Sequence, residues 1–165
     1  MGMEITPIKE SQGMGYLEAV AEHLTTAVVG LVGITNRGCY RCGRQGVMIA
    51  GVLAGPVVAK ALLEVEDDLF LDFELVGEAL RKTIPPAWLK AHFIGPLKVR
   101  RSRPRPEGYI SNGCHSCDAI IGTSPLREAV EKIGMARLPE FVIGPAMIPL
   151  DALREAVNGV KLEWS

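Results

Sequence analysis

The chain has 165 residues, of which 48% are apolar and 22% are charged, as is usual for a globular domain. This length suits one domain with a hydrophobic core of its own, and the composition excludes a wholly disordered chain. The formal net charge of -1 gives no overall attraction to nucleic acid or to an acidic membrane surface. Binding to a polyanion would therefore need a local cluster of cations.

The start of the chain and its most apolar stretch argue against a secreted or membrane protein. Residues 1–10 lack the basic start and the apolar run of a secretory signal. The stretch from Val47 to Ala59 is shorter than the roughly 20 residues that a membrane-spanning helix needs. We therefore expect a cytoplasmic protein with no membrane partner. Thiols are reduced in that compartment, so paired cysteines favour metal ligands or redox centres over structural disulfides.

The first half of the chain predicts helices around two buried strands. Apolar residues recur at helical spacing from Tyr16 to Thr25, which predicts an amphipathic helix. Two apolar, β-branched runs, Ala27–Ile34 and Val47–Leu53, predict buried strands. A helix is expected over Leu69–Lys82, ended by the two prolines that follow, and a short one around Trp88.

The second half predicts shorter elements of both kinds. We expect a strand at Ala119–Ile121 and another at Glu140–Ile143. A helix should begin with Ser124 as its cap and Pro125 as its first residue, and end at Gly134. A last helix should cover Pro149–Asn158 and stop at Gly159. The mixture predicts one α+β domain spanning residues 1–165.

Four cysteines in two Cys-x-x-Cys pairs carry the clearest chemical signal. The pairs are Cys39/Cys42 and Cys114/Cys117, and this spacing lets two sulfurs converge on one ion from a tight turn. A residue that tolerates left-handed backbone geometry follows each pair, Gly43 in the first and Asp118 in the second. Structural zinc takes four ligands in a tetrahedron. The two knuckles, residues 39–43 and 113–118, therefore predict one Zn²⁺ site.

The pairs are far apart in the sequence. Residues 43–113 separate them, whereas a compact zinc ribbon has about 15–20 residues between its pairs. We therefore expect a split site in which the ion clamps two distant parts of one fold, which stabilises more than closing a short loop. Iron in a four-sulfur site is an alternative metal. The alternative without a metal is four reduced cysteines that simply pack in the interior.

The two cysteine pairs with their flanking residues resemble the two knuckles of a zinc-ribbon protein with a large insertion between them. The phrase Gly108-Tyr-Ile-Ser-Asn-Gly-Cys-His-Ser-Cys-Asp-Ala119 is similar to the distal knuckle of uncharacterised bacterial proteins of that kind. This resemblance covers about a fifth of the chain. It implies the same four ligands, and it implies no activity.

A dithiol active site is a second interpretation of Cys114-His-Ser-Cys117. Such a site places its first cysteine at a helix N-terminus, which lowers the thiol pKa. Residues 138–143 resemble the proline-then-strand segment of thioredoxin-like folds. Against a thiol-disulfide oxidoreductase, too few residues lie between Cys117 and Pro139 for the elements of that fold. This interpretation also leaves Cys39 and Cys42 unexplained.

A basic segment offers a third interpretation, binding of nucleic acid. Its cations are Lys98, Arg100, Arg101, Arg103 and Arg105. Phosphate contacts by such side chains gain affinity through counterion release, and zinc knuckles recur among nucleic-acid binders. The alternative is that these cations pair with the acidic run Glu64–Glu74 within the same molecule.

No residue cluster has a catalytic signature. The three histidines are scattered singly, and no His-x-x-Glu-His motif is present. We expect four thiolates to leave His115 no place as a ligand, and His92 to be structural. The sequence therefore favours a zinc-binding interaction module, with a protein or nucleic-acid partner, over an enzyme.

Overall fold

The computed structural model describes the backbone of residues 25–164 and the side chains of residues 25–159. The helix predicted for Tyr16–Thr25 lies outside the described residues, apart from its last residue. Within the described part, helices and antiparallel sheets form one α+β domain, as predicted. None of the helices described is both long and apolar enough to cross a membrane.

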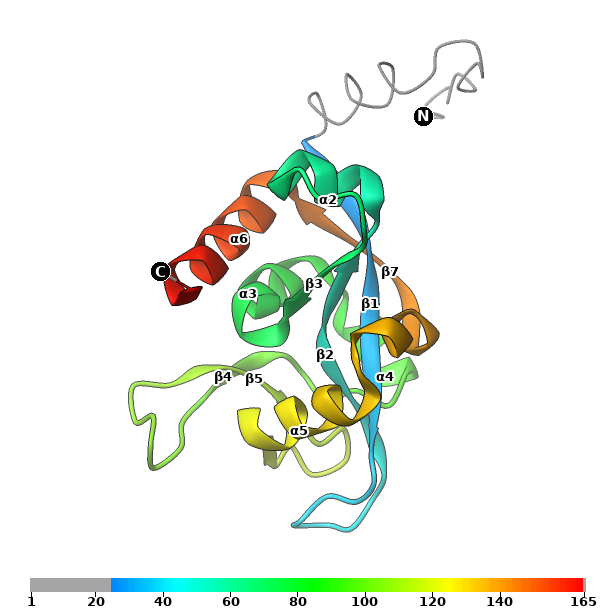
Figure 1. The fold of residues 1–165 in the computed structure, drawn as a ribbon. Coiled ribbons are helices and arrows are strands. Elements are labelled where there is room, and N and C mark those ends of the chain that lie inside the picture. The colour runs from blue at the N-terminus through cyan, green and yellow to red at the C-terminus, as the bar shows by residue number, and fades with distance from the viewer. Residues whose placement is uncertain (1–24, 165) are drawn as a thin grey trace, which may run out of the picture.

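A four-stranded antiparallel sheet forms the centre of the molecule (Figure 1). Its strands are β1 (Thr26–Asn36), β2 (Gly46–Ala54), β3 (Leu69–Asp72) and β7 (Val142–Pro149), in the order β3-β2-β1-β7. The predicted strands 27–34 and 47–53 are β1 and β2, which form a long hairpin with Asn36 opposite Gly46 at its end. The loop of this hairpin, residues 37–45, carries the first cysteine pair.

A smaller sheet carries the second cysteine pair. It consists of β4 (Lys98–Arg100), β5 (Tyr109–Gly113) and β6 (Ile120–Ile121), in the order β4-β5-β6. The side chain of Asn112 joins this sheet to the central one. Its Oδ1 accepts a hydrogen bond from the backbone N–H of Ile49 at 2.8 Å, and its Nδ2 donates to the Ile49 carbonyl at 2.9 Å. The β2–β3 pairing ends at Gly51, so Ile49 has no partner in β3. Asn112 takes the place of that partner and satisfies both the N–H and the carbonyl of Ile49.

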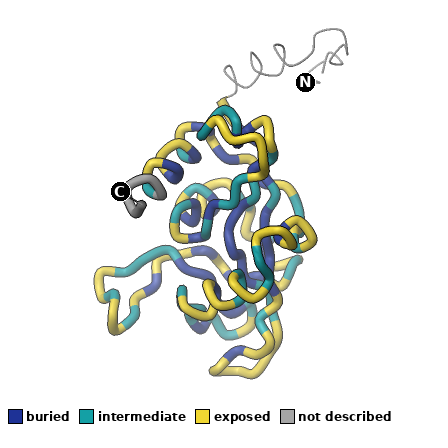
Figure 2. Tube along the Cα trace, viewed as in Figure 1, coloured by how far each residue is buried: buried dark blue, intermediate teal, exposed yellow. Residues whose placement is uncertain are grey.

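The helices pack around the central sheet. They are α2 (Pro56–Leu63), α3 (Phe73–Thr83), α4 (Pro86–Ala91), α5 (Thr123–Ile133), the 3₁₀ helix η2 (Met135–Phe141) and α6 (Leu150–Trp164). Helix α3 contacts α6, β2 and β7, while η2 lies against β1 and α5 against β2 and η2. The buried positions follow the central strands and the inward sides of these helices (Figure 2). Leu31, Ile49, Leu80 and Leu153 are among the side chains fully enclosed there.

Two helices predicted in the first half of the chain are present, one of them with a different start. The helix predicted for Leu69–Lys82 is wrong over its first four residues, which form β3 beside β2. The helix begins only after Asp72, whose carboxylate accepts a hydrogen bond from the Leu75 N–H at 3.4 Å. Asp72 is an N-cap, a role that suits aspartate because its side chain satisfies an otherwise unpaired N–H. The short helix expected around Trp88 is α4.

Three boundaries in the second half also differ from prediction. Helix α5 begins at Thr123 after Gly122, so Ser124 is not its cap. Pro125 is tolerated because the N–H groups of the first turn have no helical partner. The strand predicted at Glu140–Ile143 overlaps β7 by only two residues, since η2 extends to Phe141. Pro145 and Pro149 of β7 have no backbone N–H to donate. This is tolerated because β7 is an edge strand of the sheet.

Gly159 is not the helix stop that the sequence predicts. Helix α6 continues through it to Trp164. A Cβ at Gly159 would lie 3.1 Å from Cδ2 of Leu75, which is tighter than an ordinary van der Waals contact. The glycine thus lets α6 approach α3 closely, which outweighs its poor helix propensity of about 1 kcal/mol relative to alanine.

Candidate metal centre

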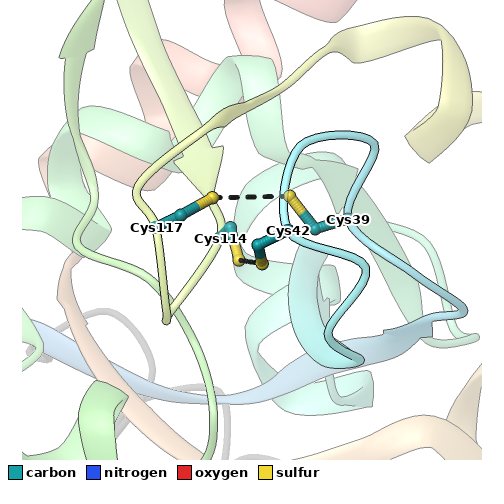
Figure 3. Close-up of side chains that lie close together, drawn as sticks. All are labelled: Cys39, Cys42, Cys114 and Cys117. Atoms are coloured by element: carbon teal, nitrogen blue, oxygen red, sulfur yellow. Dashed lines mark hydrogen bonds between the residues drawn. The ribbon is translucent and has the colours of Figure 1, made fainter.

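The sulfurs of Cys39, Cys42, Cys114 and Cys117 meet in one place, and all four lie within 4.8 Å of one another. Figure 3 shows the first pair reaching in from the β1–β2 loop and the second from the segment between β5 and β6. The Sγ atoms of Cys39 and Cys117 are 3.6 Å apart, as are those of Cys42 and Cys114. A tetrahedron with zinc–sulfur bonds of about 2.3 Å has edges of about 3.8 Å. The donor set and its spacing therefore fit a metal ion in a zinc-ribbon-like site.

The two knuckles have the same backbone hydrogen bonds, position by position. In the first, the Gly43 N–H donates to the Cys39 carbonyl at 2.8 Å, and the Cys39 N–H donates to the Arg44 carbonyl at 3.0 Å. In the second, the Asp118 N–H donates to the Cys114 carbonyl at 2.9 Å, and the Cys114 N–H donates to the Ala119 carbonyl at 2.8 Å. The two segments therefore form the same tight turn.

The turn geometry explains the residue that follows each pair. Gly43 has φ of 76° and Asp118 has φ of 63°. Glycine adopts this left-handed geometry without cost, and aspartate tolerates it better than most residues. The positions that the sequence singled out are thus the ones where each turn reverses.

Backbone N–H groups also point at the first sulfur of each pair. The N–H of Arg41 lies 3.4 Å from Sγ of Cys39, and that of Ser116 lies 3.4 Å from Sγ of Cys114. These donors stabilise negative charge on sulfur, which is the form that binds a metal. In the first knuckle, the N–H groups of Cys42 and Arg41 lower the pKa of Cys39 to about 6.

The four thiols do not lose their protons equally. A hydrogen bond from the Ala119 N–H favours the Cys117 thiolate, yet burial and the three neighbouring sulfurs outweigh it and raise the pKa of Cys117 to about 11. Four negative sulfurs this close repel one another, so full ionisation needs a cation among them. The arrangement therefore suits a divalent metal ion, whose charge allows every thiolate to form.

The sulfurs are enclosed to different degrees. Cys39 and Cys114 are 7% and 4% exposed and form a small apolar cluster with Ala119, apart from the main core. Cys117 is half-buried, and Cys42 is exposed. The first cysteine of each pair is thus the inner ligand position, and Cys42 is the outermost.

An ionic network holds the second knuckle onto its sheet. The carboxylate of Asp118 pairs with both Arg100 and Lys98. The guanidinium of Arg100, 7% exposed, also donates to the carbonyls of Ser111 at 2.6 Å and Pro96 at 2.8 Å. Although partial burial would raise it, hydrogen bonds from Lys98 and Arg100 hold the pKa of Asp118 below its ordinary value.

Direct contacts also join the two knuckles beside the sulfurs. The Arg44 guanidinium donates to the Ser116 hydroxyl at 3.1 Å. Nε2 of His115 lies 2.8 Å from the Gln45 carbonyl, and the His115 ring is close enough to Gly46 that a Cβ there would clash with it. His115 is therefore a bridge between the knuckles, as expected for a residue that is not a ligand.

The basic segment is placed in two different ways. Lys98 and Arg100 belong to the Asp118 network, and Arg105 pairs with Glu74 at 3.1 Å and lies over the Tyr109 ring. Glu74 is the last residue of the acidic run, so one pairing of that run with the basic segment is present. Arg101 and Arg103 are exposed. Neither has an ion pair among the described residues.

Sequence reasoning missed Asn112 as an organising residue, and it named Glu74 only as the end of the acidic run. Asn112 is 1% exposed, and Glu74 also accepts hydrogen bonds from Arg127 and Thr123 at 3.1 Å each. No local pattern marks either residue, because their partners lie far away in the sequence. His92 is structural, as predicted, since its ring stacks on Trp88 with centroids 3.8 Å apart.

The geometry around Cys114 differs from a dithiol active site. Cys114 follows directly after β5, and the next helix begins only at Thr123. Its nearest sulfur partner is Cys42 from the other knuckle. The helix that follows these cysteines, α5, therefore does not begin at either of them.

An open groove of about 550 Å³ lies away from the cysteines, against the middle of β1 and the first half of β7. Its lining is almost entirely apolar, and Asp68 is the one titratable residue in it. Among the described residues, the four-cysteine cluster is the one group of three or more metal-binding side chains that converge. No family model, curated protein or solved structure matches the chain.

Proposed function

We propose that Cys39, Cys42, Cys114 and Cys117 bind one structural zinc ion, and that the protein is a zinc-stabilised binding module. The observation that carries this proposal is the convergence of four sulfurs at tetrahedral spacing from two equivalent turns. Four thiolates at this distance repel one another, so a cation among them stabilises the ionised cluster.

The ion would join the tip of the β1–β2 hairpin to the small sheet. Cys42 and Cys114 are 72 positions apart, so the metal closes a long loop and restricts the unfolded chain strongly. Four thiolates complete the coordination of zinc and leave no position for a catalytic water. The role supported by this ligand set is therefore structural, with function residing in the surface that the metal organises.

We expect zinc and not iron in this site because of the relative affinities of the two metals. Both metals accept four sulfurs in a tetrahedron, but a given site binds Zn²⁺ more tightly than Fe²⁺ in the usual order of divalent ions. The two are separated by colour as well as by elemental analysis. An iron site with four thiolates absorbs visible light, and a zinc site does not.

The test is metal analysis of the purified protein together with thiol counting. We expect about one zinc per chain, and four thiols that react with a disulfide reagent only after a strong chelator is added. A folded, metal-free protein whose thiols react at once, or one with a Cys114–Cys117 disulfide, would overturn the proposal. Ser116→Ala is the matched control, since it alters a knuckle residue that is not a ligand and should keep its zinc.

A further inference from the structure

We propose that the first knuckle, with Phe93 beside it, is a binding surface for single-stranded nucleic acid. Tyr40 and Phe93 would stack on bases, while Arg37 and Arg41 would contact phosphates. This inference rests on the proposed function, because the metal fixes the loop that carries three of these residues. We call these four residues the knuckle surface.

The knuckle surface contains two exposed aromatic rings. Tyr40 is 77% exposed and Phe93 is 61% exposed, and they are the two aromatic residues among the exposed large apolar side chains of the described region. Trp88 and Tyr109, in contrast, are half-buried and have partners. Exposing a large ring forgoes favourable burial, and both rings belong to segments that meet at the cysteines: Tyr40 lies between Cys39 and Cys42, and Phe93 contacts His115 of the second knuckle.

Phe93 is held outward by its backbone. Its φ is 60°, a region that bulky residues rarely adopt and that persists where the surroundings enforce it. Its carbonyl accepts a hydrogen bond from the Val47 N–H at 2.8 Å, which ties it to the start of β2 just after the first knuckle. Its ring meets the His115 ring edge-on, with centroids 5.6 Å apart.

The equivalence of the two turns relates Tyr40 to this pair. Tyr40 follows Cys39 and precedes Arg41, whose N–H donates to the Cys39 sulfur. His115 has the same place in the second knuckle, between Cys114 and Ser116, whose N–H donates to the Cys114 sulfur. Tyr40 thus stands on one knuckle, and the His115–Phe93 pair stands on the other. Both knuckles therefore have an aromatic ring at the position after their first cysteine.

The charges at this end are one-sided. Residues 25–63 contain no aspartate or glutamate, whereas the β1–β2 loop, residues 37–45, carries the exposed arginines 37, 41 and 44. The acidic residues from Glu64 to Asp68 lie in the connection between α2 and β3, at the opposite end of β2 from the hairpin loop (Figure 1). Among the described residues, the charged side chains of the β1–β2 loop are thus all cationic, and those of the α2–β3 connection are all acidic.

The acid nearest the centre does not offset these arginines. Asp118 is already paired with Lys98 and Arg100, and Arg44 is hydrogen-bonded to Ser116. Arg37 and Arg41 have no ion pair among the described residues. They remain available for an anion even beside the two negative charges of a zinc ion bound by four thiolates.

Exposed rings interleaved with cations match single strands better than duplexes. A single strand presents unstacked bases, each with a face that can stack on an aromatic side chain, and phosphates within reach of arginine. A duplex hides the base faces. An acidic protein would satisfy the arginines, but it would not require two exposed rings.

Fluorescence anisotropy of labelled strands tests the proposal. The probes are oligo(U), oligo(dT) and a duplex, each about 12 nucleotides or base pairs long. We expect micromolar binding of at least one single strand at about 50 mM salt, weakening as salt rises to about 200 mM. The RNA and DNA probes decide which sugar is preferred, and binding of either supports the proposal.

Matched variants locate the surface. We expect Tyr40→Leu to weaken binding about tenfold through lost stacking, with an unchanged dependence on salt. The double variant Arg37→Gln/Arg41→Gln should lower the slope of log affinity against log salt by about 0.7 for each lost phosphate contact. The controls are Met147→Ala, for an exposed apolar residue on β7, and Arg81→Gln/Arg154→Gln, for exposed cations on α3 and α6. Neither control should change binding.

Several results would overturn the proposal. These are no binding by zinc-loaded protein at about 100 µM in low salt, equal affinity for the duplex, or full competition by polyglutamate, which would indicate an acidic protein partner. A larger effect of Arg101→Gln/Arg103→Gln than of Arg37→Gln/Arg41→Gln would place the contacts in the basic segment. Zinc content is measured for every variant. Zinc-loaded protein that ignores nucleic acid refutes this inference alone, whereas zinc-free folded protein refutes the proposed function.

Discussion

Replacing Cys114 by serine removes the most buried of the four sulfurs and should loosen the link between the two knuckles. Its Sγ lies 3.6 Å from Sγ of Cys42, which is 72 positions away. A cross-link that closes a loop of this length stabilises a protein by about 4 kcal/mol through the entropy of the unfolded chain. For a domain of this size, each kcal/mol shifts the melting temperature by about 2–4 °C. We therefore expect the Cys114→Ser variant to melt about 10 °C below the wild type.

The assay is thermal unfolding followed by circular dichroism, with and without chelator, alongside zinc analysis. Chelator should lower the melting temperature of the wild type by a similar amount, because the binding energy of a structural metal is folding energy. It should have little further effect on Cys114→Ser. Ser116→Ala is the control in the same turn and should melt close to the wild type. A Cys114→Ser protein that melts within about 2 °C of the wild type would refute the reasoning.

Three further predictions test the contacts around the centre. Arg100→Met should lower the free energy of unfolding in urea by about 2–3 kcal/mol, because it leaves the half-exposed Asp118 without its buried partner. It should also speed the release of zinc to a chelating dye. An unchanged release rate would contradict the link between Arg100 and the second knuckle. Asn112→Leu should lower the free energy of unfolding by about 2–3 kcal/mol, since both backbone groups of Ile49 lose their hydrogen-bond partner. A urea midpoint equal to that of the wild type would show that water replaces the amide. In metal-free protein, alkylation of Cys39 by iodoacetamide should have a midpoint near pH 6, set by its lowered pKa, and that of Cys117 a midpoint near pH 11, because only the thiolate reacts. The same midpoint at both cysteines would contradict this prediction.

The two knuckles were predictable because their signal is local. Two Cys-x-x-Cys spacings, with Gly43 and Asp118 placed to reverse each turn, specify two knuckles within a few residues each. The strands β1 and β2 were equally clear, since β-branched apolar runs of that length suit a buried sheet. These features depend on the chain a few residues in either direction, and the sequence contains all of that information.

The features that sequence reasoning missed depend on distant partners. Arg100 sits in a run of cations, and nothing within that run distinguishes a buried arginine bound to Asp118 from an exposed one such as Arg103. The same holds for Asn112, whose role arises because β3 ends opposite Gly51 and leaves Ile49 of β2 without a β3 partner. Local propensity also misled where packing outweighed it. Gly159 has the usual mark of a helix end, yet α6 continues because the glycine lets it pack closely on α3.

The equivalence of the two knuckles explains how a site can be split across the chain without losing precision. Each turn is closed by its own backbone hydrogen bonds, so each presents two sulfurs in a fixed relation before the pair meets its partner. Bringing four ligands together then requires only that two rigid units be placed correctly. The hairpin places one unit at the end of β1 and β2, and Asn112 and the Asp118 network place the other beside it. The long segment between the pairs is free to build about half of the core, because it need not position the sulfurs one by one.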